Sequence, residues 1–190
     1  MRVTARMLVV LLPFVTTALP ARIQAGPLTS IEAVTSTVFQ RDQSSFSGIG
    51  LKLKIQPPQL AQGLTVVPML EYWRAKSTVR AFGIESTRKD ATLGTFMRYD
   101  FQHEGWQPYA GIGVGLHFIS DEVDAPSLGL NNESDSLIKG GVLLVGGAAF
   151  GLSGNLGNLL EAEYHYLPDQ GQFKVNWGLT WKFSAAAAAK

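Results

Sequence analysis

The segment Phe173–Phe183, near the end of the chain, restricts the possible folds more than any other. Its residues alternate between apolar side chains and polar or small ones throughout, F-K-V-N-W-G-L-T-W-K-F. A two-residue period is typical of a β-strand, because successive side chains point to opposite faces. One face carries Phe173, Trp177, Leu179, Trp181 and Phe183. Several aromatic rings on one strand face favour contact with lipid, with rings at the membrane interfaces.

The first 25 residues have the layout of a secretory signal peptide. Arg2 and Arg6 precede the apolar stretch Met7–Leu19, and a cleavage site follows at Ala25. A membrane anchor is the alternative, but the apolar stretch is shorter than the roughly 20 residues of a spanning helix. We therefore expect residues 1–25 to be removed on export and residues 26–183 to form one domain. Residues 184–190 would then be a short tail.

The composition excludes several classes of function. The chain contains 16 basic and 15 acidic residues and no cysteine. Removal of residues 1–25 takes away three arginines and no acidic residue, which leaves a slight acidic excess. We expect no nucleic-acid partner, because such proteins carry a basic excess. The absence of cysteine excludes disulfides, thiolate catalysis and cysteine-bound metals.

Seven further segments read as strands. With the closing segment, the set is Ile31–Gln40, Phe46–Ile55, Leu64–Arg74, Ala91–Phe101, Pro108–Phe118, Leu137–Phe150, Leu159–Tyr166 and Phe173–Phe183. The two faces of the first are poorly separated. Most lengths are near the roughly 9–11 residues of a tilted membrane strand, and single-chain bacterial barrels have an even strand number. The sequence therefore predicts an all-β protein: an eight-stranded antiparallel transmembrane β-barrel with an up-and-down meander.

The connections between these segments alternate in length. Gln56–Gly63, Gln102–Trp106 and Gly151–Asn158 are compact and contain turn-forming residues, whereas Ala75–Asp90 and Ile119–Ser136 are long and polar. Short periplasmic turns and long extracellular loops are typical of outer-membrane barrels. We therefore expect two long outer loops.

The charged residues of the strands lie on the less apolar faces. A soluble barrel would turn these faces outward, and that alternative predicts few exposed aromatic residues. In a membrane, one Lys or Arg facing lipid costs about 2–4 kcal/mol, so several would exceed a total stability of roughly 5–15 kcal/mol. We therefore expect an interior polar network of Lys52, Lys54, Glu71, Arg98, Asp100, Glu161, Glu163, His165, Lys174 and Lys182.

The size of the barrel limits what this interior can do. Eight strands enclose a space that side chains just fill, so we expect an ionic plug rather than a conducting channel. In the last hairpin, Glu161 and Glu163 are expected near Lys174 and Asn176.

Three segments carry a resemblance to a known family. Residues 107–115 (QPYAGIGVG), 161–166 (EAEYHY) and 176–183 (NWGLTWKF) resemble the small eight-stranded outer-membrane β-barrels of the OmpA-like and OmpX-like group. The resemblance implies a porin-like barrel in the bacterial outer membrane, reached by signal-peptide export. It also implies contact with outer-membrane lipid and lipopolysaccharide, folding by the barrel assembly machinery and a monomeric state.

The sequence lacks a recognisable catalytic site. Lipid A deacylase barrels carry a His and a Ser two residues apart on a late strand, but Leu167 stands two residues after His165. His103, His117 and His165 do not have the spacing of metal ligands, so we expect no metal and no cofactor. We expect a non-enzymatic protein with a structural or surface-interaction role. The alternative is a lipid A-modifying hydrolase without the His-x-Ser motif.

The second long loop is acidic. Its carboxylates are Asp121, Glu122, Asp124, Glu133 and Asp135. They indicate either a site that attracts divalent cations or basic partners, or a solvated surface.

Overall fold

The computed structural model describes residues 28–40, 45–79, 84–125, 130–168 and 170–183. The expected signal peptide and the expected tail lie outside these residues. Within the described part of the chain, no helix is long and apolar enough to cross a membrane.

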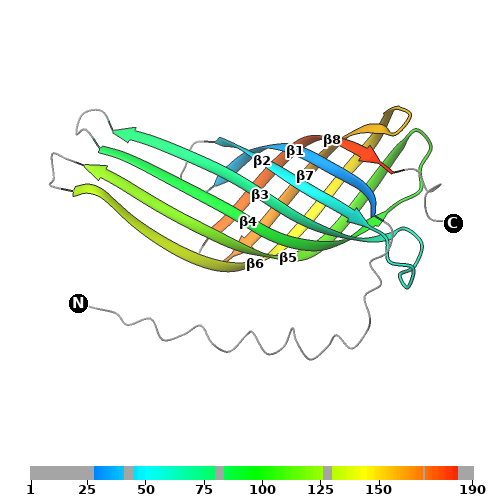
Figure 1. The fold of residues 1–190 in the computed structure, drawn as a ribbon, viewed down its shortest axis with the longest axis horizontal. Coiled ribbons are helices and arrows are strands. Elements are labelled where there is room, and N and C mark those ends of the chain that lie inside the picture. Colours follow the sequence, from blue (N-terminus) through cyan, green and yellow to red (C-terminus); the bar gives the residue numbers. More distant parts are fainter. Residues whose placement is uncertain (1–27, 41–44, 80–83, 126–129, 169, 184–190) are drawn as a thin grey trace.

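Eight strands form one closed barrel (Figure 1). They are β1 (Leu28–Gln40), β2 (Phe46–Ile55), β3 (Leu64–Val79), β4 (Ile84–Asp100), β5 (Trp106–Ala125), β6 (Leu130–Ser153), β7 (Leu156–Leu167) and β8 (Gln170–Lys182). Each strand pairs antiparallel with its neighbours in the sequence, and β1 pairs with β8 to close the barrel. The prediction of an eight-stranded antiparallel meander is confirmed.

The two expected long loops are mostly strand. β3 to β6 contain 16 to 24 residues, whereas the other four strands contain 10 to 13. Pairing between β3 and β4 continues to Val79↔Ile84, and pairing between β5 and β6 continues to Ala125↔Leu130. The loop prediction for Ala75–Asp90 and Ile119–Ser136 was therefore wrong. Most of the described side chains in these segments are exposed or half-buried, which suits polar residues, and a polar pattern does not by itself exclude a strand.

The long strands form a four-stranded sheet that continues beyond the barrel, which we call the strand extension (residues 74–79, 84–89, 119–125 and 130–141). In Figure 1 it projects at the left, past the ends of the other four strands. The pairing of β2 with β3 ends at Gly48↔Trp73, and the pairing of β7 with β6 ends at Val142↔Tyr166. Among the described residues, the extension therefore has two unpaired edges, one on β3 and one on β6. We call this end of the barrel the loop end and the opposite end the turn end.

The outer face of the barrel is apolar. On β8, Trp177 is 54% exposed and Trp181 is 53% exposed, whereas Lys174 on the opposite face is 1% exposed. Exposed aromatic rings pair near the turn end, where the centroids of Trp106 and Phe150 lie 6.3 Å apart. Others lie toward the loop end, where the rings of Phe39 and Phe173 are 6.0 Å apart. An apolar band between aromatic groups matches a surface in contact with lipid.

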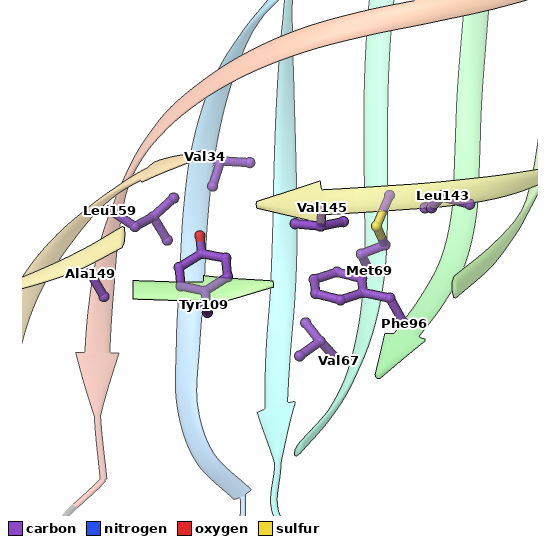
Figure 2. Close-up of a cluster of buried hydrophobic side chains, with 9 residues drawn as sticks. All are labelled: Val34, Val67, Met69, Phe96, Tyr109, Leu143, Val145, Ala149 and Leu159. Carbon is purple, nitrogen blue, oxygen red and sulfur yellow. The ribbon is translucent and has the colours of Figure 1, made fainter. Parts of the chain in front are cut away.

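One part of the interior is apolar. Val34, Val67, Met69, Phe96, Tyr109, Leu143, Val145, Ala149 and Leu159 form a buried cluster (Figure 2). Most of these residues lie on β3 to β6. The apolar cluster adjoins the polar interior described below, so the barrel is not filled by ionic side chains alone.

The glycines of β5 permit close packing of the wall. A Cβ atom on Gly113 would lie 2.2 Å from the carbonyl oxygen of Thr95 and 2.4 Å from the Cβ of Phe96. No side chain fits at that separation. Phe96 thus occupies the interior space that a side chain at position 113 would take.

Candidate functional site

The interior holds an ion-pair cluster near the turn end. The ammonium of Lys54 lies 2.5 Å from Asp100 Oδ2. The guanidinium of Arg98 donates to Asp100 Oδ1 at 2.8 Å and to Glu32 Oε1 at 3.0 Å. The Tyr109 ring lies 3.4 Å from Arg98 Cζ and covers the guanidinium. Each of the two cations thus has a carboxylate partner, which buried charges need.

A second ion-pair cluster lies in the middle of the barrel. Lys52 donates to both Glu161 and Glu163. Lys174 donates to Glu71 Oε2 at 2.5 Å, and the Lys52 ammonium lies 3.7 Å from Glu71 Oε1. All five side chains are at most 3% exposed. Three carboxylates therefore share two ammonium groups.

Tyr109 connects the two clusters. Its hydroxyl donates to Glu161 Oε2 at 3.0 Å, while its ring packs on Arg98. Asn176 donates to the other oxygen of Glu161 at 2.9 Å. Both oxygens of this buried carboxylate are therefore hydrogen-bonded.

A row of four side chains continues from the middle cluster toward the loop end. Asp90 Oδ2 lies 2.9 Å from His117 Nδ1, and His117 Nε2 lies 3.2 Å from His165 Nδ1. His165 Nε2 lies 2.9 Å from Glu163 Oε2. All four residues are at most 1% exposed. We call this row the histidine relay.

The structure places nine of the ten expected network residues in the interior. Lys182 is the exception, since it is exposed at the turn end and lines an open depression beside His103 and Trp106. The expectation for Lys182 was wrong. Buried and exposed side chains alternate along β8 only up to Trp181, and Lys182, at the end of the strand, is exposed as well. The expected neighbours in the last hairpin are confirmed, with Glu161 opposite Asn176 and Glu163 opposite Lys174.

Sequence reasoning missed several interior residues. They are Glu32, Asp90, Thr92, Tyr109, His117 and Gln172. Tyr109 and His117 share the glycine face of β5, so the strand period alone could have placed them inside. Asp90 was missed because residues 75–90 were predicted to be a loop, whereas the structure places Asp90 within β4. Glu32 was missed because apolar and polar residues are poorly separated between the two faces of β1.

One group of described residues has atoms close enough to suggest a metal site. Ligand atoms of Glu71, Glu163 and His165 lie within 4.8 Å of one another. Both carboxylates already accept hydrogen bonds from ammonium groups: Glu71 from Lys174, and Glu163 from Lys52. The negative charges of these carboxylates are therefore balanced by lysine side chains, and we interpret the group as part of an ion-pair network.

The strand extension carries its own ion pairs. Arg88 and Asp121 form a two-pronged pair, with Nε donating at 2.5 Å and Nη2 at 2.7 Å. The hydrogen bond to Asp121 raises the pKa of the Arg88 guanidinium above its ordinary value. Lys89 donates to Glu122 at 2.5 Å. Part of the predicted acidic loop is therefore paired with basic residues of β4, while the Glu133 side chain lies outside the described part.

The comparisons with known proteins support the fold. No protein-family model matches the chain, and a comparison with curated proteins found no match. Among solved structures, a major outer membrane protein from Thermus thermophilus aligns with a TM-score of 0.59 at 15% identity, covering 83% of this chain and 100% of the other. Neisserial surface protein A aligns with a TM-score of 0.58 at 13% identity, covering 82% and 96%.

A third solved structure is the attachment invasion locus protein Ail of Yersinia pestis. It aligns with a TM-score of 0.57 at 17% identity, and the alignment covers 82% of this chain and 97% of Ail. That structure is a complex with the heparin analogue sucrose octasulfate. The resemblance to small eight-stranded outer-membrane barrels is confirmed at the level of the fold.

Proposed function

We propose that this chain is a non-enzymatic outer-membrane β-barrel protein that binds extracellular partners through its strand extension. The observation that carries the proposal is the extension itself: β3 to β6 continue past the barrel, and its two outer edges are unpaired among the residues that the structure describes. Unpaired strand edges offer rows of N–H and C=O groups that another chain can join.

The location is supported by the two faces of the barrel wall. Apolar and aromatic side chains face outward, and buried ion pairs fill much of the inside. In this location the turn end lies in the periplasm and the extension lies outside the cell. Outer-membrane lipid and lipopolysaccharide then surround a monomeric barrel that the assembly machinery has inserted after signal-peptide export.

The chemistry of the extension favours an extended polypeptide as the partner. Addition of a strand to a sheet edge uses backbone hydrogen bonds for affinity and alternate side chains for specificity. On β6, Ser134, Asp135, Ser136, Leu137 and Ile138 are all exposed along the unpaired edge. This edge thus offers polar and apolar side chains to a bound strand. The names of Ail, an attachment protein, and of the neisserial surface protein are consistent with such a role.

The interior contacts of His165 argue against a hydrolase. Its ring nitrogens contact His117 and Glu163, and the ring is fully buried. Leu167 occupies the position of the expected nucleophile and is itself buried. An acyl chain of lipid A outside the wall would not reach this ring. No described feature favours the deacylase alternative.

The test is a binding assay on bacteria that produce the protein. In the shortened variant, residues 74–89 and 119–137 are each replaced by a two-residue Asn-Gly turn, so the pairs Trp73↔Asp90 and Phe118↔Ile138 keep their register next to the new turns. We expect intact cells to lose at least about tenfold of their binding to an immobilised extracellular-matrix preparation. Heat-dependent gel mobility, measured in parallel, should show the same amount of folded barrel.

A matched variant separates the edges from the charges. The double substitution Lys89→Gln and Glu122→Gln removes one ion pair of the extension and leaves both edges intact, so binding should persist. Equal binding by wild-type and shortened proteins would contradict the proposed role. A loss of acyl chains from lipopolysaccharide incubated with the wild-type barrel, but not with His165→Ala, would contradict the non-enzymatic assignment.

A further inference from the structure

The histidine relay contains three consecutive hydrogen-bond contacts. They join Asp90 to His117, His117 to His165, and His165 to Glu163, with heavy-atom distances of 2.9, 3.2 and 2.9 Å. Together the three contacts involve all four imidazole nitrogens, and each nitrogen takes part in one contact of the row. Because the row is buried and every ring nitrogen has a partner in it, the hydrogen bonds determine how many protons the row must hold.

A hydrogen bond needs one proton between its two heavy atoms. Three contacts therefore need three protons, and an ionised carboxylate supplies none. The Thr92 hydroxyl lies 3.0 Å from His117 Nδ1 but adds no proton to the row, because its single proton is donated to Asp90 Oδ1. Two neutral imidazoles supply two, since each carries a single N–H. With only two, one contact would place two lone pairs against each other in a fully buried site, which costs free energy.

We propose that His117 and His165 form a proton-binding site that holds one extra proton, so the pair carries three N–H groups and one positive charge. Nδ1–H of His117 donates to Asp90, and Nε2–H of His165 donates to Glu163. The third proton lies between His117 Nε2 and His165 Nδ1. The site lies inside the barrel and is separate from the surface proposed for partner binding.

The partners of the two carboxylates keep the proton on the imidazoles. Asp90 accepts from Thr92 at 3.2 Å and from Gln172 at 3.1 Å, so its carboxylate is stabilised as an anion. Glu163 accepts an ammonium N–H from Lys52 on its other oxygen. A carboxylate that accepts several hydrogen bonds favours its charged form.

The charges around the pair favour one added positive charge. The carboxylates of Asp90, Glu71, Glu161 and Glu163 face the two ammonium groups of Lys52 and Lys174. The guanidinium of Arg88 also acts on Asp90, but it is paired with Asp121, so an acidic excess remains. Lys139, opposite His117 on β6, does not add to them, because its ammonium donates to the carbonyl of Pro168. Buried charges require compensation, and the extra proton reduces the acidic excess by one.

The test counts protons directly in the folded wild-type barrel. Protein with ¹⁵N-labelled histidine is refolded in lipid nanodiscs, and the protonation of each ring nitrogen is determined by NMR at pH 7. The chain has three histidines, and His103→Gln identifies the signals of the exposed one. We expect three of the four nitrogens of His117 and His165 to be protonated. Two neutral rings with two N–H groups would overturn the proposal, as would a third proton located on the carboxyl of Glu163.

Two carboxamide variants sharpen the result. In Asp90→Asn, the amide can donate to His117 Nδ1, so the row needs only two imidazole protons. We expect this variant to lose one N–H and its charge. Asp121→Asn, in the strand extension, should retain all three. An unchanged count of three in folded Asp90→Asn would contradict the proposal, and the wild-type count stands if that variant does not fold.

Discussion

Lys52 on β2 reaches across the barrel to hydrogen-bond Glu163 on β7, 111 residues later in the chain. The two strands are not neighbours, because β1 and β8 lie between them. This contact and the bond from Lys174 on β8 to Glu71 on β3 tie opposite walls together. The barrel is therefore held by the hydrogen bonds of its wall and by charged contacts through its centre.

Removal of the Lys52 ammonium should be strongly destabilising. Lys52→Met keeps most of the volume but leaves Glu161 and Glu163 buried with one fewer cation. Breaking a buried pair by removing one partner costs about 3–5 kcal/mol. Urea unfolding of the barrel in lipid vesicles should show a loss of this size. Lys76→Met is the control, since its pair with Glu85 is half-exposed and such pairs contribute about 0–1 kcal/mol; equal losses would contradict the proposed role of the central cluster.

A methyl group at Gly113 should prevent normal closure of the wall. Gly113→Ala places a Cβ within 2.5 Å of three atoms of Thr95 and Phe96, two of which belong to the backbone. We expect little heat-modifiable barrel after refolding. Gly140→Ala tests the specificity of this effect, because a Cβ there meets nothing within 4 Å. Similar yields for the two variants would argue against close packing at β4 and β5.

Strand periodicity was sufficient to predict the barrel and most of the interior, but it could not predict where strands end. The inward positions of Glu161, Glu163 and Lys174 follow from alternation, since charge cannot face lipid. Contacts across the lumen, such as Lys52 with Glu163, depend on the closure of the barrel and leave no local pattern. Alternation of apolar and polar residues is also less informative where side chains on both faces of a strand are exposed or half-buried. That is why Lys182 was placed inside and the strand extension was read as loops.

Tyr109 should contribute through both its hydroxyl and its ring. Tyr109→Phe removes the hydrogen bond to Glu161 but keeps the ring on Arg98. Loss of a hydrogen bond to a buried charged group costs about 1.5–3 kcal/mol. Tyr109→Leu removes the cation–π contact as well and should cost more. Tyr99→Phe, at an exposed position on β4, should leave the free energy of unfolding unchanged; a cost for Tyr99→Phe equal to that of Tyr109→Phe would contradict this assignment.

An arginine on the outer face should report how deep each position lies in the membrane. Leu179 on β8 is 44% exposed on the apolar face, and Leu152 is 55% exposed beside the turn that joins β6 and β7. If the outer face contacts lipid, Leu179→Arg should reduce the free energy of unfolding in vesicles by about 2–4 kcal/mol, whereas Leu152→Arg near the interface should cost about 0–1 kcal/mol. In a soluble barrel both positions would face water, and neither arginine would be costly. Urea titration of the two variants in vesicles of the same lipid measures the difference, and equal small costs would show that this face does not lie in the bilayer.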